Sequence, residues 1–388
     1  MTAVAIAAVS EIPPGRYPDR SGQQLYLESI GALLRQWPLK PADIGGLFVA
    51  LSGQADGLSD NIFVHETLVE ALGIRARVAE TVNVGGSTPL VMLMRAAALI
   101  RAGLADSVLC VAAGRFPSVG GGGAARNTRI FAHPDFDGLY GPYIPPIYAQ
   151  VATRHMHEHA IGREAMAAVA VGQRAWALRH PHALMAAKGA LTAQQVLDAR
   201  PIASPFHLLD CSVPCDGGGA FLVANASLAR RICPQPAWVL GFGEIHLRAN
   251  VSQLRQLDEL GIRQAADAAY RMAGLVPSDV RLAQLYDSFS YNPILGVEQL
   301  GLVPDGRGGE FFLAGRGAPG GDLPVNTNGG LLSYGHTGDA SGLSVLAEAA
   351  LQVMGRAGDR QADAGVALAH GYGGMMCEHA VVLLGRSA

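Results

Sequence analysis

Apolar runs separated by glycine-rich turns recur along the whole chain and predict alternating strands and helices. The first run, residues 3–9, is closed by a glutamate and two prolines and predicts an N-terminal strand. Two later runs, residues 90–102 and 343–354, carry only two charges and one charge, respectively. A helix that is apolar on nearly every side belongs in the interior of a protein. We therefore expect two buried helices that lie side by side.

An internal repeat relates the two halves of the chain. The pattern Leu-x-Pro-x-Asp at residues 39–43 recurs at residues 275–279, each time before an apolar, strand-like run. Leucines and alanines of the predicted helix at residues 90–97 recur with the same spacing at residues 343–350. An Ala-Asp pair with a glycine eight residues after the aspartate recurs as well. Because the matches keep one order, we expect a duplicated α/β unit.

Residues 115–205 differ in composition from the two repeats. They begin with glycines, continue with tyrosines and prolines, and include a helical stretch near residues 148–180. Such a long insertion in a compact domain is usually functional. We expect an inserted loop domain there, an N-terminal half of residues 1–114 and 206–240, and a C-terminal half of residues 241–388.

Composition and charge exclude several classes of protein. Only 16% of the residues are charged and the net charge is -3, so the chain lacks the basic face that nucleic acids require. Its apolar runs stop short of the roughly 18 residues of a membrane span. Five cysteines without a CxxC pair, together with an N-terminus unlike a secretion signal, predict reduced thiols in the cytoplasm. Glycine is abundant, with 49 of 388 residues, which indicates many sharp turns.

The glycine-rich segment 326–342 is the most informative candidate for chemistry. It contains His336 just before the second predicted buried helix. Backbone N–H groups at a helix N-terminus favour negative charge, and a nearby histidine can transfer protons, so the segment suits acid/base work beside an anionic intermediate. A structural histidine packed in a turn is the alternative that composition alone favours.

Five blocks in this order resemble motifs of the thiolase superfamily, in particular its sterol-carrier-protein-x and lipid-transfer-protein branch. The blocks are Asn83 to Leu90, His207 to Gly219, Tyr286 to Ser290, Asn326 to Gly342 and His370 to Gly374. The resemblance implies a five-layered αβαβα fold of two duplicated halves, usually homodimeric. It also implies chemistry on carbon–carbon bonds of coenzyme A thioesters, with no permanently bound cofactor.

The family's catalytic positions carry over unevenly to this chain. His336 matches the histidine of the family's GHP motif, although a threonine replaces the proline. His370 matches the family's second cysteine, which acts as an acid/base, and Tyr286 stands where the family has an asparagine. The slot of the nucleophilic cysteine, at the start of the buried helix, falls on Gly86, with Ser87 next to it.

A glycine supplies no nucleophile, so the resemblance disfavours a classical thiolase. Proton transfer remains available, because His336, His370, Tyr286 and Tyr372 carry titratable groups. We expect Tyr286 or Tyr372 to exchange a proton with a β-oxygen, His336 to stabilise a thioester enolate, and His370 to be the other acid/base. Asp287, Asn328 and Gly374 are the expected supports of the oxyanion site.

These roles suit retro-aldol cleavage of a β-hydroxyacyl-CoA, which some lipid-transfer-protein relatives perform with an OB-fold partner protein. Two alternatives stay open. One is a condensing acyltransferase without covalent catalysis, and the other is a non-catalytic acyl-CoA or lipid-binding subunit.

Two further signals are set aside. The GxGxxG match at residues 315–320 contains a proline that argues against a dinucleotide site. His155, His157 and His159 lack the spacing of a metal site, so we expect a solvated helix face and no metal.

Tyr140, Tyr143 and Tyr148 either line an apolar channel or pack the insertion on the core.

Overall fold

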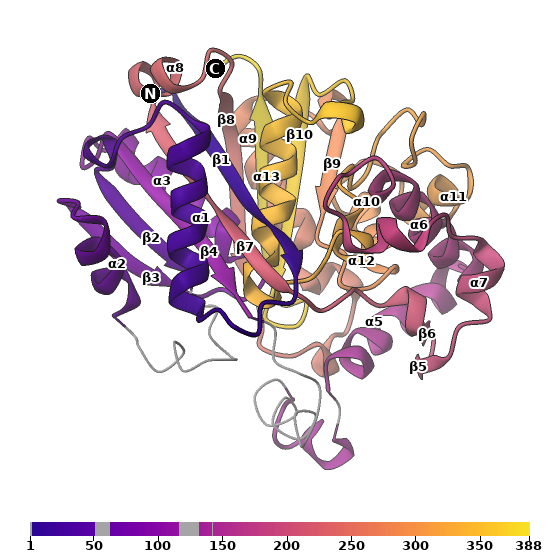
Figure 1. Ribbon diagram of the computed structural model, residues 1–388. Coiled ribbons are helices and arrows are strands. Elements are labelled where there is room, and N and C mark those ends of the chain that lie inside the picture. The colour runs from indigo at the N-terminus through magenta and orange to yellow at the C-terminus, as the bar shows by residue number, and fades with distance from the viewer. Residues whose placement is uncertain (1, 51–62, 116–131, 142) are drawn as a thin grey trace.

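The structure is a computed structural model that describes residues 2–50, 63–115, 132–141 and 143–388. In this part of the chain, nine strands form one mixed sheet in the order β3-β2-β4-β7-β1-β8-β11-β10-β9 (Figure 1). The strands are β1 (Val4–Gly15), β2 (Gly46–Ala50), β3 (Val78–Val82), β4 (Ser107–Gly114), β7 (Asp216–Asn225), β8 (Ala237–His246), β9 (Leu282–Leu285), β10 (Val366–Gly373) and β11 (Glu378–Gly385).

Two half-sheets meet at a narrow junction between β1 and β8. These strands pair only at Ala5 with Trp238 and at Ile6 with Ala237, whereas the pairing of β8 with β11 runs from His246 to Trp238. The N-terminal half therefore contributes five strands and the C-terminal half four. A division after residue 240 would cut β8 in two, so we propose that the C-terminal half begins with β8.

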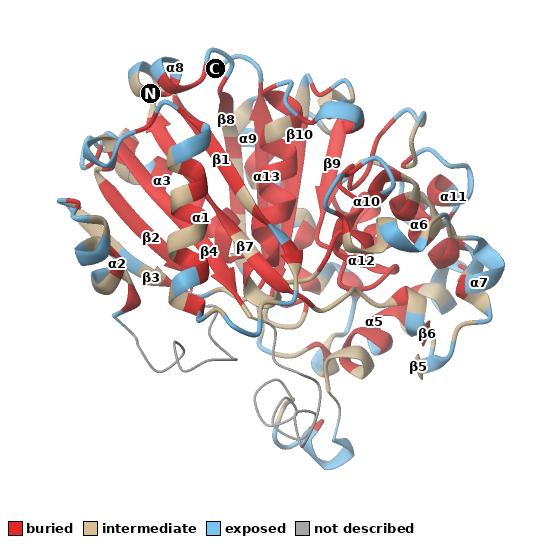
Figure 2. Cartoon of the chain, viewed as in Figure 1, coloured by how far each residue is buried: buried red, intermediate tan, exposed pale blue. Residues whose placement is uncertain are grey.

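Helices complete the layers on both sides of each half-sheet. The central pair, α3 (Thr88–Arg101) and α13 (Gly342–Val353), pack on each other, and each contacts strands of both halves. On the outside, α1 (Gly22–Gln36) packs on β1, β4 and β7, and α9 (Ile262–Ala273) packs on β8 and β11. This αβαβα order confirms the predicted fold class. Burial follows it, because α13 and the strands other than β3 and the second half of β8 are buried along nearly their whole length (Figure 2).

The internal repeat of the sequence corresponds to a structural repeat. Pro41–Asp43 and Pro277–Asp279 each form a 3-10 turn in which the aspartate accepts a hydrogen bond from the backbone three residues earlier. The first turn leads to β2, which runs parallel to β4, and the second leads to β9, which runs parallel to β10. The duplicated unit therefore consists of this turn, two parallel strands and one central helix.

The inserted segment and part of the C-terminal half build a helical body beside β9 (Figure 1). Its helices are α5 (Ile144–His159), α6 (Arg163–Ala177), α7 (Ala193–Leu197), α10 (Asn292–Gln299), α11 (Gly308–Leu313) and α12 (Gly330–Ser333), with a hairpin of β5 (Pro201–Ala203) and β6 (Phe206–His207). Two peripheral helices, α2 (Val64–Leu72) and α8 (Ala226–Ile232), belong to the N-terminal half. Among all described helices, none combines the length and the apolar character of a transmembrane span.

The solvated helix face expected for the three histidines of the insertion is wrong for one of them, since His157 and His159 are exposed and His155 is not. His155 does not lie on a solvated helix face, because it is 1% exposed and its Nε2 lies 2.8 Å from Oε2 of Glu298 on α10. Sequence spacing could not reveal this partner, which is 143 residues away. Tyr140 is exposed, whereas Tyr148 is buried and its ring lies 4.9 Å from that of Phe289, so the insertion packs on the core through Tyr148.

Candidate active site

The turn that leads into α3 lies at the centre of the candidate site. A Cβ atom added to Gly86 would lie 2.4 Å from Cζ and 2.5 Å from both Cε2 and Oη of Tyr286. Contacts of Cβ atoms below 3.0 Å essentially do not occur, so the phenol fills the space that a side chain at residue 86 needs. The position that the resemblance gives to the nucleophile is therefore occupied by a tyrosine from the turn after β9.

Tyr286 and His336 form a hydrogen-bonded pair. Oη of Tyr286 lies 2.9 Å from Nε2 of His336 and 3.5 Å from the carbonyl oxygen of Gly338, and the two rings meet edge to face. Burial, with Tyr148 and Asp339 nearby, holds the pKa of Tyr286 well above its usual value. Burial also lowers the pKa of His336 to about 4. Both groups are therefore neutral at pH 7, which allows a proton to be exchanged between them and a ligand.

The backbone of His336 is held by the block that precedes β7. Its N–H donates to the carbonyl oxygen of Val213 (2.8 Å), and its own carbonyl accepts from the N–H of Cys215 (2.9 Å). These bonds join two of the sequence blocks that carry the resemblance, although the blocks are far apart in the chain. They hold the backbone from which the imidazole extends.

Asp287 and Asn328 form hydrogen bonds to the backbone of the loop that carries His336. The carboxylate of Asp287 is fully buried and accepts hydrogen bonds from the N–H groups of Leu331 (2.7 Å) and Leu332 (3.2 Å) in α12. Burial raises its pKa to about 8, against the lowering effect of these N–H groups. The side chain of Asn328 accepts from the N–H of Gly330 (2.9 Å). Both residues shape the loop that carries His336.

The side chain of Ser87 forms a hydrogen bond within the turn before α3. It is 1% exposed, and its Oγ donates to the carbonyl oxygen of Val84 (2.7 Å). A Cβ at Gly373 would lie 2.9 Å from the same Oγ, so glycine on β10 allows α3 to approach. Gly374 has φ +49° and lies against Glu378, which explains a glycine there by backbone conformation.

His370 and Tyr372 lie together on β10, and a residue that the sequence did not suggest lies beside them. His379 on β11 is paired in register with Tyr372. The ring centroids of His370 and Tyr372 are 4.6 Å apart, and Tyr372 lies 6.3 Å from Tyr286. The structure thus brings the four residues expected to transfer protons or stabilise the enolate into one neighbourhood, with Tyr286 beside His336 and Tyr372 beside His370. Strand register could have pointed to His379, but only once β10 and β11 were aligned.

Asp339 is a second residue that sequence reasoning missed. It follows His336 in the same glycine-rich segment, and burial together with Glu378 raises its pKa to about 6. Asp339 in turn contributes to the raised pKa of Tyr286. Its place in the glycine-rich segment was the available signal.

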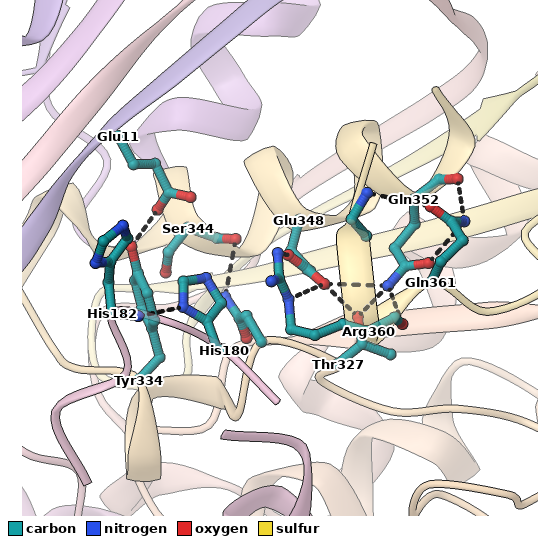
Figure 3. Close-up of polar contacts among 12 residues, drawn as sticks. Glu11, His180, His182, Thr327, Tyr334, Ser344, Glu348, Gln352, Arg360 and Gln361 are labelled. Carbon is teal, nitrogen blue, oxygen red and sulfur yellow. Dashed lines mark hydrogen bonds and ion pairs between the residues drawn. The ribbon is translucent and has the colours of Figure 1, made fainter. Parts of the chain in front are cut away.

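A buried polar network anchors the His336 loop on α13 and β1 (Figure 3). Glu348 and Arg360, 1% and 8% exposed at their side chains, form an ion pair of 2.9 Å. Thr327 donates to Glu348 (2.7 Å), and Tyr334, two residues before His336, donates to Glu11 (3.1 Å). Burial and the nearby Glu348 raise the pKa of Glu11 to about 8. The network therefore ties the loop to α13 through Thr327 and to β1 through Tyr334.

No group of three or more His, Cys, Asp and Glu side chains in the described residues is arranged to hold a metal ion. The five cysteines are all free thiols. Burial raises the pKa of both Cys211 and Cys215 to about 12, so neither is an activated nucleophile.

Comparisons with known proteins place this geometry in context. A family described as "Thiolase C-terminal domain-like" matches residues 243–386. An acetyl-CoA acetyltransferase of Methanothermobacter thermautotrophicus is 30% identical over 100% of both chains. A steroid side-chain-cleaving aldolase of Thermomonospora curvata is 28% identical over 93% of each chain.

Two solved structures extend the comparison. The Ltp2-ChsH2(DUF35) aldolase has a TM-score of 0.85 and 26% identity, over 99% of this chain and 98% of that chain. Human mitochondrial 3-ketoacyl-CoA thiolase in complex with CoA has a TM-score of 0.70 and 18% identity, over 100% and 98% of the two chains. The second likeness is one of fold alone.

Proposed function

The chain belongs to the thiolase superfamily, and on that premise we propose that it is an enzyme that cleaves β-hydroxyacyl-CoA thioesters by a retro-aldol reaction, without a covalent acyl-enzyme. The superfamily relatives include a steroid side-chain-cleaving aldolase and an aldolase of known structure, which support this reaction class.

The observation that carries the proposal is the phenol of Tyr286 in the space beside Gly86. A thiol at residue 86 has no room while the ring is there, whereas the ring itself brings a hydroxyl, bonded to His336, to that point. The exchange of a nucleophile for an acid/base group suits a reaction that moves protons and needs no acyl transfer.

The proposed reaction balances as follows. A base removes the proton of the β-hydroxyl, the Cα–Cβ bond breaks, and its electron pair stays on Cα as the thioester enolate. An acid then protonates Cα, which gives a shortened acyl-CoA and a ketone or aldehyde. We assign the exchange with the β-oxygen to Tyr286 or Tyr372, stabilisation of the enolate to His336, and the other acid/base role to His370.

The substrate and partners follow the same premise. We propose a coenzyme A thioester as substrate with no resident cofactor, a homodimer, and a cytoplasmic location. The solved aldolase is named for two components, Ltp2 and ChsH2(DUF35), which supports a partner protein for this chain, and we propose the small OB-fold protein that the resemblance implies.

The test is direct turnover. Purified protein, alone and with any protein that co-purifies from its host, is incubated with a panel of β-hydroxyacyl-CoA thioesters, and both products are measured by mass spectrometry. We expect the shortened acyl-CoA and the carbonyl product in equal amounts. No cleavage on the whole panel, with thioester binding intact, contradicts the proposal and favours the non-catalytic binding subunit.

A condensing acyltransferase is the second candidate, because the relative that is 30% identical over the full length is an acetyl-CoA acetyltransferase. The same preparations separate the two functions. Formation of a 3-ketoacyl-CoA and free coenzyme A from two acyl-CoA molecules supports condensation, whereas a carbonyl product supports the aldolase.

A further inference from the structure

Three aromatic side chains form a closed cluster between β10 and β11. His370 and Tyr372 are two residues apart on β10, so their side chains lie on the same face of the sheet. His379 on β11 is the strand partner of Tyr372. The ring centroid of His379 lies 5.4 Å from that of His370 and 5.0 Å from that of Tyr372. All three side chains are buried, with exposures of 0%, 2% and 1% for His370, Tyr372 and His379.

Hydrogen bonding fixes where the protons of the two histidines lie. Nε2 of His379 is 3.0 Å from the carbonyl oxygen of Met376, which can only accept, so this nitrogen carries a proton. Burial lowers the pKa of His379 to about 3, so the ring is neutral and its Nδ1 holds a lone pair. Nε2 of His370 lies 3.3 Å from that Nδ1 and must therefore donate to it.

His370 is consequently left with an unprotonated Nδ1. Burial and the nearby His379 hold the pKa of His370 well below its usual value, so the neutral ring has one proton, on Nε2. Nδ1 of His370 and Oη of Tyr372 are buried and have no hydrogen-bond partner among the described residues. Buried polar atoms without partners are uncommon, and a catalytic role is one reason for them. Here an acceptor and a donor on two neighbouring rings are left unused.

We propose that His379 is a positioning residue that holds His370 in the Nε2–H tautomer, so that Nδ1 of His370 accepts the proton that the hydroxyl of Tyr372 gives up when that hydroxyl takes the proton of the substrate's β-hydroxyl. This inference rests on the proposed function for its chemistry, but the tautomer itself is a property of the resting protein. It makes His370 the base of the pair and gives the β11 strand a part in the site.

The alternative is that His379 only fills the core, and two substitutions separate the readings. His379→Asn keeps an acceptor oxygen at the place of Nδ1, whereas His379→Leu keeps the volume and removes the acceptor. Thermal unfolding and the Kd of a non-cleavable thioester analogue show whether each variant is folded and binds. We expect both to bind like the parent protein.

The first measurement is the tautomer. Long-range proton–nitrogen NMR correlations of the full chain, labelled with 15N in histidine, distinguish Nδ1–H from Nε2–H, and the His370→Gln variant assigns the signal. We expect Nε2–H for His370 in the parent and in His379→Asn, and a mixture in His379→Leu. A protonated Nδ1 in the parent protein overturns the proposal, whatever the activity.

The second measurement is turnover. Partners that orient a metal-ligating histidine are worth roughly 10-fold to 100-fold, and we take the same range for a partner that orients His370. We expect His379→Leu to lose about that factor in kcat with KM nearly unchanged, and His379→Asn to recover most of it. An unchanged kcat in His379→Leu overturns the proposal. If the parent protein cleaves no substrate, the proposed function fails while the NMR result still decides the tautomer.

Discussion

Substituting Gly86 by alanine tests the contact on which the proposed function depends. The added methyl carbon would lie 2.4–2.5 Å from three atoms of the Tyr286 phenol. Since the ring is 5% exposed and hydrogen-bonded to His336, it has little room to retreat without breaking that bond. Overpacking of this kind costs about 1–3 kcal/mol of unfolding free energy. Displacement of an acid/base group costs roughly 100-fold to 10,000-fold in rate.

The assays are urea unfolding and cleavage of the best substrate found. Gly172→Ala is the matched control. Gly172 lies in α6, and a Cβ atom there would be 3.5 Å from its nearest neighbour, the Cβ of Ala318, which is an ordinary contact distance. We expect the control to react like the parent protein and to unfold at the same or a slightly higher urea concentration, because alanine is favoured over glycine in a helix interior by about 1 kcal/mol. The double variant Gly86→Ala/Tyr286→Leu should regain stability, since the ring that clashes is gone, but not activity.

The reasoning is refuted if Gly86→Ala matches the parent within twofold in rate and unfolds at the same urea concentration. That result would mean that the ring does not hold the space beside residue 86. A loss of activity without any loss of stability would show that the ring moves easily and that only its hydroxyl position matters.

Three further predictions concern the same scaffold. Tyr286→Phe removes the hydroxyl but not the ring, so cleavage should fall by roughly 100-fold or more with unfolding nearly unchanged, measured by steady-state kinetics and urea titration; full activity would assign the proton exchange to Tyr372 instead. Arg360→Leu leaves Glu348 as an uncompensated buried charge and should cost about 3–5 kcal/mol in urea unfolding, and a change below 1 kcal/mol would contradict the network. Because the pKa of Glu11 is raised to about 8 in the folded protein, its contribution to stability is fully present below the unfolded pKa near 4.5 and is lost as the pH rises from there through 8. Glu11→Gln should therefore lose less stability than the parent between pH 6 and pH 9, and parallel pH profiles would exclude Glu11 as the titrating group.

Sequence patterns predicted the layers well because the layers depend on local properties. Nearly uncharged helices such as α3 and α13 have to be enclosed, and a turn such as Pro41–Asp43 is encoded by a few neighbouring residues. The family resemblance likewise placed His336 at the site, since its glycine-rich motif is contiguous.

Contacts between distant residues were beyond the sequence. The sequence around Gly86 does not indicate that the phenol of Tyr286 occupies the space that a side chain at residue 86 would need. The role of His379 depends on the register of β10 with β11, and the burial of His155 depends on its partner Glu298 on another helix. In each case the deciding quantity is a distance across the fold, which composition and spacing do not contain.

The narrow junction between β1 and β8 has a consequence for how the molecule holds together. Two backbone pairings contribute little cohesion, so the halves are joined mainly through α3 and α13, each of which completes the core of the other half. Either half alone would leave its central helix open to water along an apolar flank. The two halves are therefore expected to unfold as one cooperative unit, and a substitution in the buried part of one central helix destabilises both halves.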